Sequence, residues 1–146
     1  MILKIEEVPT QDDIEVTITF PAKNQTTERI ISFMKTVDEQ IECSFDNKIK
    51  MVSISDIYYF ESMENTTRVF CEKESYQTKL RLYQLNEKLS DKGFVQVSKY
   101  CILNINKLEY FKPVLNSRME VTLSNGSRLY INRTYLADLK RRLKND

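Results

Sequence analysis

The chain has 146 residues, of which 41% are hydrophobic, and it contains only two glycines and three prolines. This length suits one compact domain with a core, and so few glycines and prolines argue against a disordered or linker-like chain. No stretch approaches the roughly 20 apolar residues that a membrane-spanning helix needs. Met1 does not open a basic and then apolar export signal, so we expect a cytoplasmic protein.

The net charge of +1 conceals an uneven distribution of charged residues. Residues 1–42 hold four basic and nine acidic side chains, a net charge of −5. Residues 43–146 hold 18 basic and 12 acidic side chains, a net charge of +6. Such a split is expected when only the second part binds a polyanion, although chance variation in a solvated surface also produces it.

The composition excludes most catalytic chemistry. The chain has no histidine, no glycine-rich phosphate loop and no serine elbow, so we expect no enzymatic activity and no small-molecule substrate. Its three cysteines, Cys43, Cys71 and Cys101, lie far apart and form no CxxC pair, which argues against a metal site or another cofactor. We expect them to be reduced core thiols.

The first third of the chain reads as a strand followed by a helix. Apolar and polar residues alternate strictly from Ile14 to Phe20, which predicts a half-buried strand that ends at Pro21. Thr26 or Thr27 is expected to cap the helix that follows. One face of this helix carries four apolar residues: Ile30, Phe33, Met34 and Val37. Because a strand and helix of this size cannot bury their apolar sides alone, we expect residues 1–42 to be a separate segment for dimerisation or regulation.

Short strands dominate the remainder of the chain, residues 43–146. We expect strands around residues 49–60, 68–71, 94–97 and 107–111, with a short amphipathic helix over residues 80–89. A hairpin pairs residues 119–123 with residues 129–131 across Asn125-Gly126, a dipeptide that suits a type I′ turn. A last helix begins near Asn132.

Four sequence blocks in this order resemble the LytTR-type DNA-binding domain of bacterial transcription regulators. They are DIYYFES at Asp56–Ser62, YQTKLRLYQLNEKL at Tyr76–Leu89, GFVQVSKYCILN at Gly93–Asn104 and NGSRLYINRTYL at Asn125–Leu136. The resemblance implies a mainly β fold of about ten strands in small stacked antiparallel sheets with short helices. It also implies that loops, rather than a helix, insert side chains into successive major grooves of promoter repeat sites.

Carrying the contacts of that family over by position gives three loop clusters. The DNA-binding residues implied are Thr67 and Arg68, then Ser98, Lys99 and Tyr100, and finally Asn132 and Arg133. Three of these depart from the usual pattern, which puts the target sequence in doubt. Ser98 stands where histidine is common, Lys99 where arginine or asparagine is common, and Asn132 where serine is common.

The chemistry of two of these residues supports the assignment independently. Arg133 has a planar fork of donors that can bond guanine O6 and N7 together, whereas Lys99 is a flexible point charge. Each also has a plain interpretation, as a charge at a helix start or in a solvated turn. The basic residues near the C-terminus, Lys140, Arg141, Arg142 and Lys144, could contact phosphates. The helix dipole alone also favours cations in a last helical turn, and this is the interpretation that we prefer.

The expected partners follow from the resemblance. They are double-stranded DNA and a second copy of the chain in a homodimer. Because residues 1–42 are too short for a receiver domain, we expect a stand-alone regulator. The sequence leaves its control open between a membrane protein, a peptide or another regulatory partner, and abundance alone. A β-rich module that binds protein or RNA is the alternative function.

Overall fold

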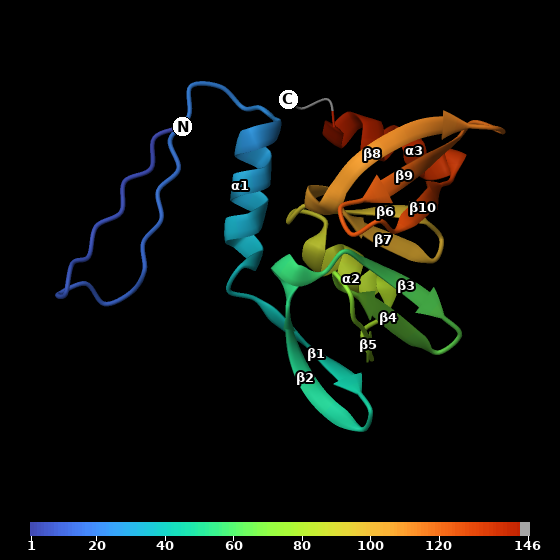
Figure 1. Ribbon diagram of the computed structural model, residues 1–146, viewed down its shortest axis with the longest axis horizontal. Helices are drawn as coiled ribbons and strands as arrows, with labels where there is room; N and C mark the ends of the chain where they lie inside the picture. Colours follow the sequence, from blue (N-terminus) through green and yellow to red (C-terminus); the bar gives the residue numbers. More distant parts are fainter. Residues whose placement is uncertain (144–146) are drawn as a thin grey trace.

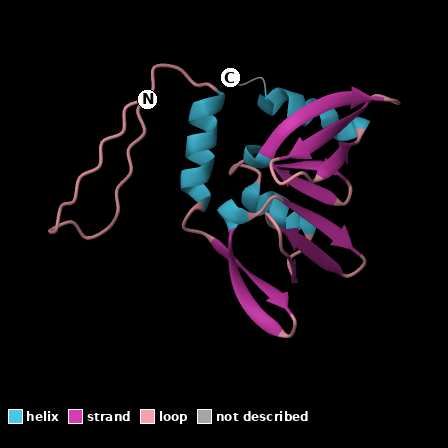
Figure 2. Ribbon diagram, viewed as in Figure 1, coloured by secondary structure: helices cyan, strands magenta, loops and turns pink. Residues whose placement is uncertain are grey.

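The computed structural model describes residues 1–143, which form two antiparallel sheets and three α-helices (Figures 1 and 2). The larger sheet has the strand order β2-β1-β5-β4-β3-β7-β6 and the smaller one β10-β9-β8. The larger sheet comprises β1 (Gln40–Phe45), β2 (Lys48–Ser53), β3 (Tyr59–Met63), β4 (Thr66–Phe70), β5 (Ser75–Thr78), β6 (Phe94–Ser98) and β7 (Cys101–Asn104). The smaller sheet comprises β8 (Leu108–Val114), β9 (Arg118–Leu123) and β10 (Arg128–Ile131), and the helices are α1 (Gln25–Thr36), α2 (Leu82–Leu89) and α3 (Arg133–Leu143). None of these helices is long and apolar enough to cross a membrane.

The larger sheet buries side chains on both of its faces at β6 and β7. Phe94 and Ile102 lie in one hydrophobic cluster, together with side chains of α2. Their neighbours Val95 and Leu103 lie in the other, together with α3 and the smaller sheet. Successive residues of a strand point to opposite faces, so strands buried on both sides read as continuous apolar runs. The segment from Phe94 to Asn104 therefore joins the two cores.

The predicted hairpin is present, but its turn is not of type I′. Val121 pairs with Leu129 and Met119 with Ile131, as expected from the alternation. Of the two turn residues, Gly126 alone takes a positive φ, of 89°. Its amide donates to the carbonyl of Leu123, which is typical of a type I turn followed by a left-handed glycine. The expected type I′ geometry was wrong because the loop is one residue longer than that turn allows.

The predicted strand over residues 14–20 is wrong. These residues are extended but form no ladder with another segment of residues 1–143. Together with residues 1–13 they make a long two-legged arm that projects from the rest of the molecule (Figure 1). The alternation is real, but its apolar side chains have no sheet or core to bury them, and Ile14 is 88% exposed. We call residues 1–20 the arm.

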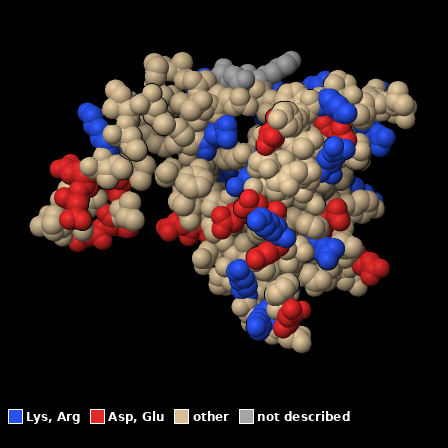
Figure 3. Space-filling model, in the orientation of Figure 1, with Lys and Arg blue, Asp and Glu red and all other residues tan. Residues whose placement is uncertain are grey.

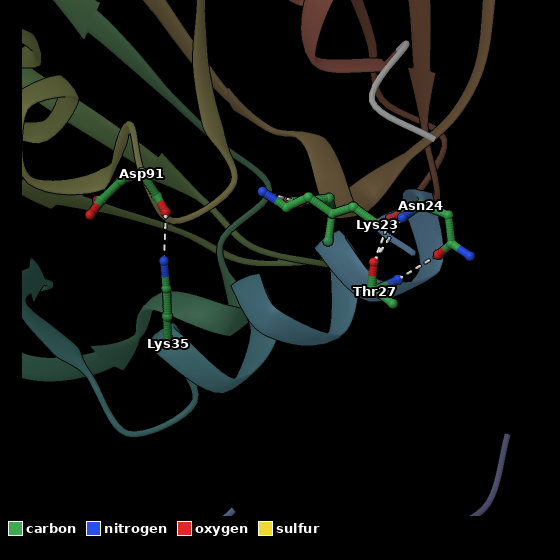
Figure 4. Close-up of polar contacts among 6 residues, drawn as sticks. Lys23, Asn24, Thr27, Lys35 and Asp91 are labelled. Atoms are coloured by element: carbon green, nitrogen blue, oxygen red, sulfur yellow. Dashed lines mark hydrogen bonds and ion pairs between the residues drawn. The ribbon is translucent and has the colours of Figure 1, made fainter. Parts of the chain in front are cut away.

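The predicted helix begins at Gln25, and its cap is Asn24 rather than a threonine. The Asn24 side chain accepts a hydrogen bond from the amide of Thr27 at 2.9 Å, and the Thr27 hydroxyl accepts one from the amide of Asn24 at 2.9 Å (Figure 4). This reciprocal pair is a capping box, in which threonine at the third helical position replaces the usual acid or amide. The cap was predicted too late in the chain because three nearby residues, Asn24, Thr26 and Thr27, all have capping side chains.

Helix α1 packs on the domain with its small and polar side. Thr27 and Thr36 are buried, and Lys35 donates to the carbonyl of Asp91 at 3.5 Å (Figure 4). A Cβ atom added to Gly93 would lie 3.0 Å from both Cβ and Oγ of Ser32, so the helix rests directly on a glycine. Gly93 also takes a φ of 90°, which the connection between α2 and β6 requires. The predicted apolar face of α1 therefore points away from the domain.

Two of the three cysteines are buried in the cores, as predicted. Burial raises the pKa of the Cys101 thiol to about 12 and that of Cys43 to about 11. Cys71 is half-buried, and desolvation raises its pKa to about 11. A thiol needs its thiolate form to act as a nucleophile, so these three are unreactive near neutral pH.

The contact between α1 and Gly93 yields a stability prediction. Gly93→Ala and Gly126→Ala both force alanine into a positive φ, at a cost of roughly 1–2 kcal/mol each. Nothing lies within 4 Å of a Cβ at Gly126, whereas a Cβ at Gly93 crowds Ser32. Urea unfolding should therefore show Gly93→Ala to be the more destabilised, by about 1 kcal/mol or more. Equal losses in the two variants would contradict the seating of α1 on this glycine.

Candidate nucleic-acid interface

Three short connections lie together on the side of the domain opposite the arm (Figure 1). The first is the turn between β3 and β4 at residues 64–65. The second is the turn between β6 and β7 at residues 99–100, and the third is the start of α3 at residues 132–134. We call these three connections the loop edge. They contain or adjoin five of the seven residues that the family resemblance implied, while Thr67 and Arg68 lie farther along β4.

The β6–β7 turn is short and is held by its own side chain. Ser98 pairs with Cys101 across the turn, and the Ser98 hydroxyl accepts a hydrogen bond from the Tyr100 amide at 3.2 Å. Lys99 and Tyr100 are both exposed at the tip, with the lysine Nζ 5.7 Å from the centre of the tyrosine ring. This contact restricts the conformations of the Lys99 side chain, while its ammonium group remains in solvent.

A β-bulge joins the second connection to the third. Gln96 pairs with Ile102 and Ser98 with Cys101, so Val97 is an extra residue in β6 without a partner in β7. The carbonyl of Val97 accepts a hydrogen bond of 3.1 Å from the amide of Asn132, directly before α3. A bulge frees one residue from the ladder and re-aims the strand, and here it holds the start of a helix.

A second backbone hydrogen bond joins the β6–β7 turn to the first connection. The amide of Ser62 near the end of β3 donates to the carbonyl of Tyr100 at 2.8 Å. Since β3 leads directly into the 64–65 turn, all three connections are linked by main-chain bonds. Main-chain links of this kind fix positions that would otherwise vary with loop motion.

The two residues implied in the first cluster do not occupy equivalent positions. Thr67 is 1% exposed within β4, and its burial does not fit a direct contact with DNA. Arg68 is half-buried, opposite Glu61 in the register of β3 and β4, with its guanidinium carbon 5.8 Å from the Phe70 ring. Its reach toward a ligand is therefore limited by packing along the sheet surface.

The third cluster combines an exposed cation with a helix start. Arg133 is the first residue of α3 and is exposed. Asn132 occupies the capping position, where its carbonyl accepts the amide of Tyr135 at 2.9 Å and its amide is bound by Val97. The backbone thus fixes the direction in which Arg133 leaves the helix, and the helix N-terminus adds a partial positive charge.

The loop-edge cations differ from the basic residues at the C-terminal end of α3. Within residues 1–143, no carboxylate forms an ion pair with Lys99 or Arg133. In contrast, Arg141 and Arg142 both pair with Asp138, and Arg142 also donates to the carbonyl of Phe94 at 2.7 Å. Arg141 and Arg142 therefore have partners within the domain, while Lys144 lies outside the described residues.

Sequence reasoning missed the residues that shape the loop edge rather than line it. Val97 reads as an ordinary core residue, and the side chain of Gln96, which donates to the carbonyl of Ser98 at 3.1 Å, reads as a solvent-facing strand position. Glu64 takes a positive φ of 51° in the β3–β4 turn, which is uncommon for a residue with a side chain. None of these three has a sequence signal of its own. The Asn104 side chain, by contrast, accepts a hydrogen bond from the amide of Asn106 at 3.0 Å, a local turn bond that is typical of asparagine.

The comparisons with known proteins agree with this geometry. The model of the LytTr DNA-binding domain family matches residues 47–144. The sensory transduction protein LytT of Enterococcus faecalis is 28% identical over 105 residues, and that of Bacillus anthracis is 31% identical over 99 residues. These matches cover 72% and 68% of this chain but 43% and 40% of the LytT proteins, so the chain spans about two fifths of their length.

An uncharacterised HTH-type transcriptional regulator of Staphylococcus aureus is 26% identical over 125 residues, which are 84% of each protein. Although that name refers to a helix-turn-helix, five strands separate α2 from α3 in this chain.

A solved structure shares this fold. It is the LytTr DNA-binding domain of a putative methyl-accepting/DNA response regulator from Bacillus cereus, with a TM-score of 0.69 and 20% sequence identity. The match covers 73% of this chain and 98% of that one. Because the family match alone extends over more than half of the sequence, from residue 47 to residue 144, the chain belongs to the LytTR DNA-binding domain family.

Proposed function

We propose that this protein is a transcriptional regulator, and that it recognises specific duplex sequences by inserting side chains of the loop edge into successive major grooves of a repeated promoter site. The observation that carries the proposal is the pair of backbone hydrogen bonds that tie the three connections together. Two exposed cations, Lys99 and Arg133, lie on the edge that these bonds hold together, and neither forms an ion pair with a carboxylate of residues 1–143. A preorganised edge loses little conformational freedom when it binds, so more of its contact energy appears as affinity.

The two cations are suited to different parts of the duplex. Arg133 has a fixed direction and a planar fork that matches guanine O6 and N7, a contact worth roughly 1–3 kcal/mol of discrimination. Lys99 is a point charge at the tip of a turn, beside Tyr100, and suits a phosphate. Ser98, Tyr100 and Asn132 contribute mainly by positioning these two residues, and Arg68 flanks them from the sheet.

Recognition of a repeated site requires two copies of the loop edge. Dimeric DNA-binding proteins place their reading elements about one helical turn apart, or a multiple of it, and so bind paired half-sites. We therefore propose a homodimer that acts in the bacterial cytoplasm, where duplex DNA is accessible.

The first prediction concerns base recognition. Arg133→Ala should weaken binding to the operator by about 5- to 150-fold, the equivalent of one bidentate base contact. Binding to scrambled duplex should change much less, because phosphate contacts carry no sequence information. Titration of both duplexes at fixed salt measures the two losses. An equal loss on both would assign Arg133 to the DNA backbone, and equal affinity for single strands would favour the RNA-binding alternative.

A second prediction separates Lys99 from Arg133 by salt dependence. Lys99→Ala should weaken all sequences alike and lower the slope of log affinity against log salt by about one unit per bound half-site. Arg133→Ala should leave this slope nearly unchanged. Affinities at several salt concentrations on matched and mismatched duplexes decide the matter. A Lys99→Ala variant that relaxes preference at one base pair with an unaltered slope would make Lys99 a base reader.

Thr67→Val provides a matched control for both experiments. The substitution keeps the shape of a side chain that is buried in β4, so it should change operator affinity by less than about threefold. Its thermal unfolding should be measured alongside, to separate folding from binding. A loss of affinity comparable to that of Arg133→Ala, in a variant that remains folded, would show that β4 opens to present Thr67 to the DNA.

A further inference from the structure

More than half of the large apolar side chains that are exposed within residues 1–143 belong to the arm and α1, away from the loop edge. Eight large apolar side chains of the arm are exposed: Met1, Ile2, Leu3, Ile5, Val8, Ile14, Val16 and Phe20. Three more on α1 continue the surface: Phe33, Met34 and Val37. We call these three, together with Ile30, the α1 stripe. Soluble monomers rarely expose contiguous apolar surface on this scale unless a partner covers it.

The backbone of the arm is not paired with another strand of residues 1–143. Its two legs enclose a cleft of about 1270 Å³ that is lined by arm residues and by Met34 of α1. The amide of Gln11 donates to the carbonyl of Val8 at the tip, but the two legs form no ladder. Extended legs therefore leave main-chain donors and acceptors available along their length, which is the arrangement that favours pairing with another strand.

The size of this surface matches what a second copy requires. A buried aliphatic or aromatic side chain removes roughly 60–120 Å² of apolar surface from water. Eight arm side chains and three of the α1 stripe thus offer on the order of 800 Å², the area that each partner buries in a standard stable interface. Folding the arm back on its own α1 would cover the stripe but leave both outer edges of a two-stranded ribbon unpaired.

Charge also favours contact between the arm of one copy and the helix of another. The arm carries five acidic residues, Glu6, Glu7, Asp12, Asp13 and Glu15, against Lys4, a net charge of −4. Residues 21–37 carry Lys23, Arg29 and Lys35 against Glu28, a net charge of +2. Figure 3 shows the acidic side chains gathered on the projecting arm. In a symmetric dimer, the acidic arm of each copy would lie beside the basic helix segment of the other, so this favourable pairing would occur two times.

We propose that residues 1–37 form the homodimer interface, with the arm of each copy packed against the arm and the α1 stripe of the other. The two arms then build a shared layer of strands covered by two helices. This inference rests on the proposed pairing of two copies and specifies the surface that holds them. Because the arm lies on the side opposite the loop edge, the interface leaves both loop edges free for DNA (Figure 1).

The test is the oligomeric state of the full chain without DNA. Sedimentation across the micromolar range should show a reversible dimer for the unchanged protein. Val16→Glu and Phe33→Glu should each weaken the dimer by at least tenfold, since each places a charge in the apolar interface. Val16 is 57% exposed and Phe33 46% exposed in a single copy, so each variant should remain folded, which circular dichroism checks.

Ile49→Glu is the matched control. Ile49 is 72% exposed on β2, an edge strand of the larger sheet, and so is an exposed apolar side chain outside the arm and α1. This variant should dimerise as the unchanged chain does. The proposal is overturned if the unchanged chain is a monomer throughout the range. It is equally overturned if Ile49→Glu alone dissociates the dimer, or if no variant does.

A DNA measurement separates this proposal from the proposed function. Phe33→Glu should keep its affinity for a single half-site and lose most of its advantage on paired sites. Arg133→Ala should lose operator binding while remaining a dimer. Loss of half-site binding in a folded, monomeric Phe33→Glu variant would contradict the independence of the two surfaces.

Discussion

The loop edge depends on one irregular residue, Val97. Its side chain is buried in the second core, while its carbonyl, freed from the ladder by the bulge, accepts the amide of Asn132. Without the extra residue, β6 and β7 would pair regularly and that carbonyl would be consumed within the sheet. The start of α3 would then have no fixed relation to the β6–β7 turn. A net hydrogen bond contributes only about 1 kcal/mol to stability, so its main effect here is on geometry.

Both faces of the larger sheet are packed where it leads into the loop edge. The strands β6 and β7 are buried on both faces, by α2 on one and by α3 with the smaller sheet on the other. Such burial makes the turn between them a rigid projection rather than a mobile loop. It also explains how a protein without a helix-turn-helix can present exposed cations in a fixed arrangement. The two cores hold the edge in place, and Lys99 and Arg133, which we propose as its DNA contacts, are exposed at the rim.

The two ends of the molecule have opposite character. The arm is extended, has a net negative charge and exposes apolar side chains that nothing in its own chain covers. The loop edge is compact, carries exposed cations and is held by main-chain hydrogen bonds. Helix α1 lies between them, seated by Ser32 on Gly93 and turning its apolar stripe outward. A single glycine therefore connects the packing of the domain to the orientation of the surface that we propose for dimerisation. In this proposal, the separation of the two surfaces lets two copies pair without obstructing DNA.

The sequence alone predicted α2, α3, the β9–β10 hairpin, strands near β4, β6 and β8, and the buried cysteines. It missed β5, and it did not separate β2 from β3, which a 3-10 turn at Ile54–Asp56 divides. Alternation and helical spacing are local properties that the sequence shows directly, and the order of the four motif blocks indicates the family. Only the tertiary structure decided that Thr67 is buried, that Val97 forms a bulge and that residues 14–20 have no ladder partner. Each of these depends on which strand or core residues, distant in the sequence, lie next to the segment in the fold. An alternating pattern states which side chains prefer burial, but a neighbouring strand or core must be present to bury them.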